Sequence, residues 1–192
     1  MTAVQLGDQR QLRADARRNR ERILEGARTV FAECGVDAQM DDVARRAGVG
    51  VGTVYRHFPT KEALMVELVR QKFRTFAQNA RAALEREGEP FAVLADLLRQ
   101  NAEVCARDAG IQHALSGFVE QVWSEAQGEF EELIAPTAEL IARAQRAGTM
   151  RRDVSVTDIP MLMCGVSATM THTGPGFDWR RHLELVISML RA

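Results

Sequence analysis

The sequence is poor in cysteine and has no long apolar run, and both absences narrow the classes of protein that it can encode. The three cysteines, Cys34, Cys105 and Cys164, are odd in number and far apart along 192 residues. This favours free thiols in a reducing cytosol over a disulfide framework. No apolar run approaches the ~20 residues of a membrane span, and the N-terminus lacks the apolar core of a secretory signal. We expect a cytoplasmic protein with no membrane partner.

The sequence also lacks the signatures of catalysis and of nucleotide or metal binding. It has no Gly-x-Ser-x-Gly segment and no cysteine signature for nucleophilic chemistry. The glycine-rich stretch 48–53 lacks the Gly-Lys-Ser/Thr ending of a phosphate-binding loop. The histidines lie at no metal-ligand spacing from a Cys or an acid; they are His57, His113, His172 and His182. We expect no enzyme activity, no cofactor and no metal site.

The net charge is close to zero, but the charges are unevenly distributed. Residues 1–61 carry eleven Arg and Lys against eight Asp and Glu, whereas the rest of the chain carries fourteen against eighteen. A basic front and an acidic rear are typical of a nucleic-acid-binding head joined to a body with another role.

Apolar residues recur at helical spacing along most of the chain, and no segment alternates as a strand does. A first helix is expected from Asp15 to Gly35, after a loose arm over 1–14. The pattern indicates further helices over about 39–47, 51–57, 61–84, 91–105, 115–122, 129–147, 159–170 and 179–190. The predicted fold is all-α, with about nine helices.

Residues 35–61 have the pattern of a helix-turn-helix unit. Small apolar residues, Val43, Ala44 and Ala47, allow a second helix to cross closely. Gly48 stands where the turn needs a left-handed residue, and Val54 and Phe58 can anchor the second helix. The start and exposed side of that helix would enter the major groove of DNA.

Residues 35–64 closely resemble the DNA-binding domain of the TetR (tetracycline repressor) family. They show its Ala-Gly-Val-x-x-Gly-Thr-hydrophobic-Tyr-x-aromatic-Phe pattern followed by Lys-Glu, here over 47–62. Three positions depart from the family: Gln39 replaces the usual Thr or Ser cap, Gly50 replaces a frequent Ser, and His57 replaces the commoner Tyr.

The resemblance implies a helix-turn-helix DNA-binding domain over 1–60 and a helical-bundle ligand-binding and dimerisation domain over 61–192. The expected contacts with double-stranded operator DNA are made by Arg45, Val51, Gly52, Thr53, Tyr55, Arg56, His57 and Lys61. The expected pocket for a small-molecule effector is lined by Phe73, Phe76, Cys105, His113, Phe118, Trp123 and Met163. The expected homodimer interface comprises Leu162, Val166, Met170, Trp179, Leu183, Val186, Ile187 and Leu190.

Two functions are consistent with these features. The first is a sequence-specific transcriptional regulator, a repressor released by a small hydrophobic or amphipathic ligand. The alternative is a ligand- or protein-binding helical module that has lost DNA affinity, which Gln39 and Gly50 would explain. Salt-dependent binding to DNA distinguishes the two.

Overall fold

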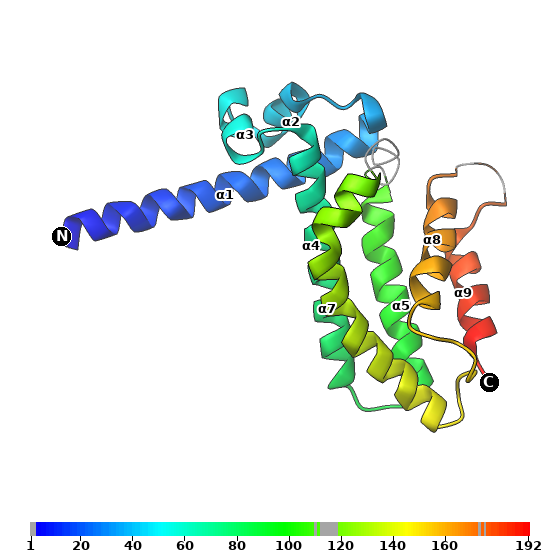
Figure 1. The fold of residues 1–192 in the computed structure, drawn as a ribbon. Coiled ribbons are helices and arrows are strands. Elements are labelled where there is room, and N and C mark those ends of the chain that lie inside the picture. The colour runs from blue at the N-terminus through cyan, green and yellow to red at the C-terminus, as the bar shows by residue number, and fades with distance from the viewer. Residues whose placement is uncertain (1–2, 110, 112–118, 173, 175) are drawn as a thin grey trace. The chain divides into compact units, whose positions relative to one another are not determined.

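A computed structural model describes the chain except residues 1–2, 110, 112–118, 173 and 175 (Figure 1). Among the described residues are eight α-helices, one short 3-10 helix (η1, Gly35–Asp37) and no strand. The α-helices are α1 (Ala3–Cys34), α2 (Met40–Ala47), α3 (Val51–His57), α4 (Lys61–Leu84), α5 (Pro90–Arg107), α7 (Val119–Arg146), α8 (Asp158–Met170) and α9 (Trp179–Leu190). The all-α prediction is confirmed. No helix of this described part is long and apolar enough to cross a membrane.

The chain divides into two compact units, and the division falls inside a helix. The first unit comprises Met1–Leu68 with Gly110–Val119, and the second comprises Val69–Ala109 with Glu120–Ala192. The helix α4 therefore supplies its first two turns to one unit and the rest to the other.

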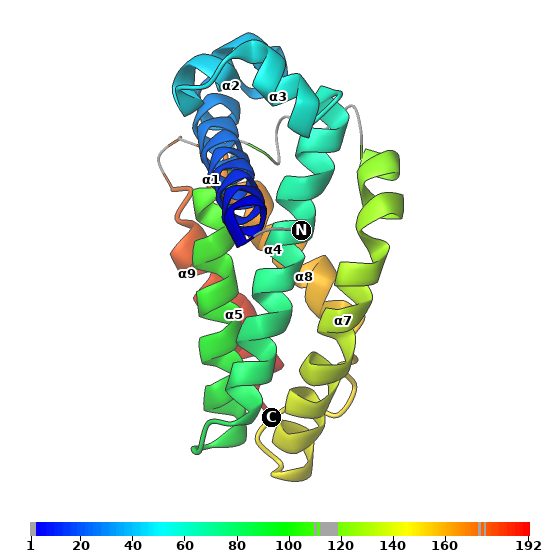
Figure 2. The same ribbon diagram turned by 90° about the vertical axis from the view of Figure 1, so that its left-hand side faces the viewer.

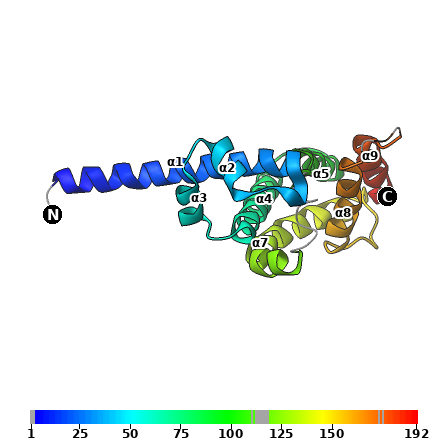
Figure 3. The same cartoon turned by 90° about the horizontal axis from the view of Figure 1, so that it is seen from above.

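The first unit is built on α1, with α2 lying across it (Figures 1 and 3). Its core joins Ile23, Ala27 and Phe31 of α1 to Val43 of α2 and Val54 of α3, together with Leu64 and Leu68 of α4. Burial of this one apolar cluster holds the short helices α2 and α3, which are too short to be stable alone.

The helix α1 begins twelve residues earlier than predicted, at Ala3 instead of Asp15. The expectation of a loose arm over 1–14 was wrong, and Asp15 is no cap but an interior residue whose carboxylate pairs with Arg18 one turn later. Residues 3–22 have no apolar stripe, but they are mostly Ala, Leu, Gln and Arg, which favour a helix without one.

The second unit packs α5, α7, α8 and α9 with the remainder of α4 around a separate core. Its buried residues include Leu94 and Leu98 of α5, Leu140 of α7, and Leu183 and Ile187 of α9. Polar contacts along α4 add to this packing: Arg74 bonds to Glu129 of α7 at 2.8 Å, and Asn79 bonds to Asn101 of α5 at 2.9 Å. Figure 2 shows these helices running alongside one another.

Two predicted helices of this region, over 115–122 and 129–147, are not separate in the part that the structure describes. From Val119 onward they form one helix, α7, which runs to Arg146 and includes Pro136. The residues between them, 123–128, contain Gly128 but no proline, and glycine lowers helix stability without ending a helix. The expected residues 115–118 lie outside the described part of the chain.

Candidate nucleic-acid interface

The turn between α2 and α3 has the geometry that its glycine predicts. Gly48 adopts φ 63° and ψ 40°, a left-handed conformation that costs other residues about 1–2 kcal/mol. The amide of Gly48 donates to the carbonyl of Arg45 at 3.2 Å, and that of Val49 donates to Ala44 at 3.1 Å. These bonds end α2 and turn the chain directly into α3.

Two contacts that sequence reasoning missed hold this turn against α1. The Nη2 atom of Arg22 donates to the carbonyl of Gly48 at 3.0 Å. At Gly26, an added Cβ would lie 3.0 Å from the backbone nitrogen of Ala47, so the helices α1 and α2 approach too closely for a larger residue there. Only the small size of Gly26 could have suggested this crossing from the sequence.

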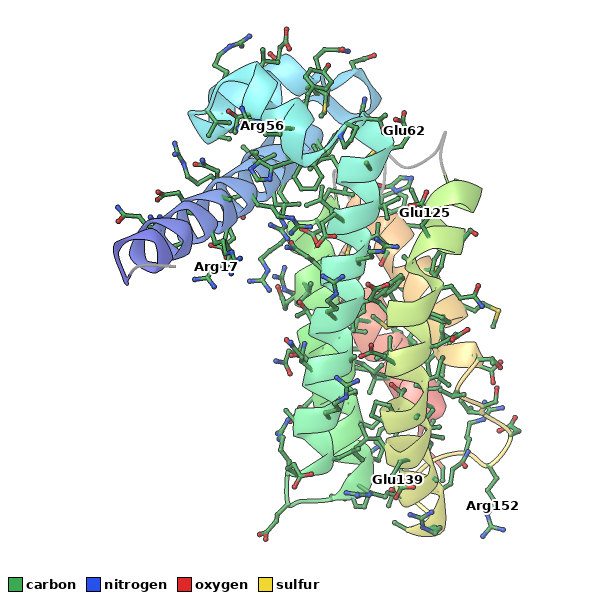
Figure 4. All side chains as sticks on the ribbon, turned by 60° about the vertical axis from the view of Figure 1, so that its left-hand side comes forward. Arg17, Arg56, Glu62, Glu125, Glu139 and Arg152 are labelled. Carbon is green, nitrogen blue, oxygen red and sulfur yellow. The ribbon has the colours of Figure 1, made fainter. Side chains whose placement is uncertain are left out.

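The far end of α3 is fixed by buried apolar residues and by one arginine. Val54 and Phe58 are buried, as predicted. Arg20 of α1 lies over the Phe58 ring, 5.3 Å from its centroid, and its Nη2 atom is 2.9 Å from Oε2 of Glu67 on α4. Arg20 and Arg22 therefore have structural contacts within the first unit, whereas Arg17 projects from the opposite side of α1 to α2 and α3 (Figure 4).

With Val54 and Phe58 turned inward, Val51, Gly52, Tyr55 and Arg56 share the exposed face of α3. Val51 is 43% exposed and Tyr55 is 47% exposed, so two large side chains lie together at the surface. The side chains of Tyr55 and Arg56 have no hydrogen bond or ion pair with any described residue. Figure 4 labels Arg56 in this helix. This face is free to bind another molecule.

Neither Gly50, the N-cap residue of α3, nor Gly52 is required to be glycine by the described structure. A Cβ added at Gly50 or Gly52 would have no atom within 4 Å, and neither residue has a positive φ. A glycine inside a helix lowers its stability by about 0.5–1 kcal/mol relative to alanine. Gly52 is therefore unfavourable for the fold, which is understandable if another backbone or a base approaches it closely.

The other residues predicted to contact DNA are partly buried or contact side chains of their own chain. Thr53 and His57 are half-buried. Arg45 is exposed, and its Nη1 atom is 3.1 Å from Oδ1 of Asp42. The Nζ atom of Lys61 lies 5.7 Å from the centroid of the Phe31 ring. Lys61 opens α4 directly after Thr60, whose hydroxyl accepts a hydrogen bond from the amide of Ala63 at 3.1 Å and so caps the helix.

The predicted pocket residues that the structure describes are divided between core and surface. Phe73, Phe76 and Cys105 are buried, Met163 is half-buried, and Trp123 is 43% exposed. His113 and Phe118 lie outside the described residues. Burial raises the pKa of the Cys105 thiol, so this residue is a neutral part of the core.

An aromatic cluster joins two of these residues to one that was not predicted, Phe130 of α7. The Phe73 ring centroid lies 5.3 Å from that of Trp123 and 5.5 Å from that of Phe130. The centroids of Trp123 and Phe130 are 5.6 Å apart. Such edge and tilted contacts stabilise aromatic groups beyond simple burial.

The predicted dimer residues are packed within their own chain. Val166, Leu183, Val186, Ile187 and Leu190 are buried, and Leu162, Met170 and Trp179 pack partly against the same core. The same helices expose other apolar residues, namely Met161 (66% exposed) on α8 and Leu185 and Met189 (45% and 60%) on α9. The predicted interface does not include these three, because it followed only the stripe with the strongest helical period.

Comparisons with known proteins agree with this arrangement. Residues 23–68 match the family described as bacterial regulatory proteins, tetR family, and residues 89–192 match the C-terminal domain of SbtR-like transcriptional regulators. The HTH-type transcriptional repressor KstR of Mycolicibacterium smegmatis is 28% identical over 99% of this chain and 96% of its own. The crystal structure of a TetR transcription regulatory protein from Mycobacterium vanbaalenii is 40% identical, covers 94% of this chain and 99% of its own, and has a TM-score of 0.68. The regulator SCO0520 from Streptomyces coelicolor is 30% identical, covers 90% and 98%, and has a TM-score of 0.66.

Proposed function

The chain belongs to the TetR family of DNA-binding transcriptional regulators, and on this premise we propose that it is a homodimeric repressor that a small-molecule effector releases from operator DNA. The observation that carries the proposal is the exposed face of α3, where Tyr55 and Arg56 have no polar partner among the described residues. In each protomer this helix enters the major groove of one half-site, as recognition helices do.

The contacts divide by chemistry. We assign the residues with hydroxyl or cationic groups to the phosphates, whose contacts position the protein without reading sequence. These residues are Arg45, Thr53, Tyr55 and Lys61. Val51, Gly52, Arg56 and His57 lie nearest to the bases. Arg45 can reach a phosphate because its partner Asp42 forms only an exposed ion pair with it, and such pairs contribute little.

The dimer forms through the outer faces of α8 and α9. Met161, Leu185 and Met189 are exposed in one chain and would be covered by a second copy, while the predicted residues behind them hold the two helices to their own core. Two-fold symmetry then presents two α3 helices to the two halves of an operator.

The effector site lies in the second unit, near the aromatic cluster of Phe73, Trp123 and Phe130. Aromatic walls with a few polar groups suit a hydrophobic or amphipathic molecule. Because α4 contributes to both units, a ligand that displaces its C-terminal part changes the helix that carries Glu67, the partner of Arg20.

The test is a polarisation assay with DNA from upstream of the protein's own gene, over a range of salt concentrations. We expect binding that weakens steeply with salt, and the double variant Tyr55→Ala, Lys61→Ala should weaken it strongly. The matched control is Arg152→Ala, which removes a positive charge from an exposed loop of the second unit (Figure 4).

Two results would contradict the proposal. Unchanged binding by the double variant would exclude the assigned surface. Absence of any salt-dependent binding would favour the alternative function, a ligand- or protein-binding module without DNA affinity. Gln39 supports that alternative weakly, because its side chain makes no capping bond at the start of α2 and instead donates to the carbonyl of Asp37.

A further inference from the structure

The exposed face of α3 carries two side chains that can distinguish one base pair from another. We propose that in each operator half-site Arg56 reads a guanine and Val51 reads the methyl group of a thymine. The proposal rests on the function proposed above, because it names the operator sequence features that the same surface recognises.

Arg56 is suited to guanine because of the geometry of its guanidinium and because this group has no partner among the described residues. Its planar guanidinium can donate two parallel hydrogen bonds to O6 and N7, an arrangement that only guanine offers in the major groove. Within the described structure no acidic side chain or carbonyl holds this group, in contrast to Arg45 with Asp42, Arg46 with Glu33 and Arg22 with Gly48. Arg56 is thus free to form both bonds without losing an internal one.

Val51 is suited to thymine because it is apolar, exposed and short. It lies in the first turn of α3, and its two methyl groups are not needed by the core. The only apolar group on the major-groove edge of a base pair is the C5-methyl of thymine. A valine reaches that methyl only if the helix backbone comes close to the base, and the open position at Gly52 permits this approach.

The other residues of the helix are less able to read bases. Gly52 has no side chain, and Thr53 and His57 are half-buried on the flank of the helix. Val54 is buried. Tyr55 shares the exposed face but is assigned above to a phosphate, so base reading by α3 depends on its first and sixth residues.

Their positions on α3 indicate that they read separate bases. Val51 and Arg56 are five residues apart, which is about 7.5 Å along a helix axis. Five residues also turn the helix by about 500°, so the two side chains point about 140° apart around the axis and reach different base pairs of the half-site.

The experiment selects binding sites from random double-stranded DNA with the full-length protein and with R56A, V51A and R45A. The native protein should enrich half-sites with an invariant G·C pair and, at another position of the same half-site, an A·T pair. R56A should lose the preference at the G·C pair alone, with affinity for the native site about 5- to 150-fold lower. R45A, a matched arginine variant, should weaken all sites alike and leave the enriched sequence unchanged.

Modified bases identify the atoms. Replacing the guanine by 7-deazaguanine removes the N7 acceptor and should weaken binding by the native protein but not by R56A. Replacing the thymine by deoxyuridine removes only the methyl group and should weaken native binding about 4-fold, with no effect on V51A. Circular dichroism of each variant establishes that it is folded.

The outcomes separate this inference from the proposed function. If the native protein enriches no sequence, the proposed function fails and this inference fails with it. If it enriches an operator whose G·C preference persists in R56A, or whose affinity is indifferent to deoxyuridine, the inference is wrong while the regulator function stands.

Discussion

The side chain of Arg20 joins α1 to α4 through an ion pair with Glu67, in which Nη2 of Arg20 lies 2.9 Å from Oε2 of Glu67. Glu67 is only 7% exposed. The same guanidinium lies over Phe58, the residue that ends α3. One arginine therefore connects the DNA-binding helix pair to the helix that continues into the second unit.

Replacing Arg20 by alanine should lower the free energy of unfolding by about 1–3 kcal/mol. Breaking a fully buried ion pair costs about 3–5 kcal/mol, but the Arg20 side chain is partly exposed and its loss is screened by water. Urea denaturation of R20A measures the change. Arg17→Ala, on the same helix and highly exposed, is the control and should change stability by less than about 0.5 kcal/mol. Equal effects of the two variants would show that the Arg20 contacts contribute little.

Gly48→Ala should destabilise the protein and abolish DNA binding together. The left-handed conformation costs alanine about 1–2 kcal/mol, and its Cβ would lie 2.7 Å from Nη2 of Arg22 and displace that side chain. Thermal unfolding and a polarisation assay measure the two effects. A variant that binds DNA normally would mean that the turn tolerates another geometry.

Gly52→Ala should raise the stability of the protein and lower its affinity for DNA. Alanine favours the helix by about 0.5–1 kcal/mol, and it meets no atom within 4 Å, so the melting temperature should rise. DNA affinity should fall, because the added methyl group holds α3 away from the bases. Stability and affinity measured on the same preparation check both signs, and a gain in affinity would contradict the close approach that we infer.

Leu185→Glu and Met189→Glu should convert the proposed dimer to a monomer without unfolding the chain. Both side chains are exposed in one chain, so a charge costs the fold little, but it would be buried between two copies. Sedimentation velocity measures the change in mass, and DNA affinity should fall with it. Ser124→Glu, at an exposed position of α7, should remain dimeric. Variants that stay dimeric would exclude the proposed interface.

The contact between Arg99 and Glu184, which joins α5 to α9, predicts a dependence on pH. Two hydrogen bonds from Arg99, at 2.7 and 2.8 Å, hold the pKa of Glu184 below its usual value of 4.5. A carboxyl group whose pKa is lowered by folding stabilises the fold above its unfolded pKa, and this contribution is lost as pH falls through the folded pKa.

Glu184→Gln should therefore lower the free energy of unfolding at pH 7, by less than about 1 kcal/mol because both side chains are well exposed. The difference from the native protein should shrink as pH falls below 4.5 and vanish once the native carboxyl is protonated. Urea titrations at several pH values measure it, with the exposed Glu87→Gln as control. A difference that does not vary with pH would show that the ion pair is not its cause.

The sequence was informative where structure is local and less so where it depends on distant residues. The left-handed Gly48 follows from the conformational preference of glycine, and the burial of Val54 and Phe58 follows from the apolar pattern of the helix pair; all three were predicted. The contacts of Arg20 with Glu67 and of Phe73 with Phe130 join residues far apart in sequence, and no local pattern indicates them.

The helices α8 and α9 show a second limit of sequence patterns. An apolar stripe at helical spacing shows that a face is buried, but it does not show whether the same chain or a second copy covers it. Val166 and Ile187 lie in the core of their own chain, whereas Met161 and Met189 are the exposed ones. Only the structure separates the two sets.

The position of the boundary at Leu68 inside α4 has a practical consequence for engineering this regulator. A fragment cut at residue 60 would lack Leu64, Met65 and Leu68, which fill the first core, so an independently folding DNA-binding fragment should extend through them. Chimeras with the sensing half of a relative would be joined within a continuous helix, without a flexible linker. Each inserted residue turns the following side chains by about 100° around the helix axis. Such fusions must therefore preserve the helical phase, because otherwise the apolar residues of the grafted half no longer face their core.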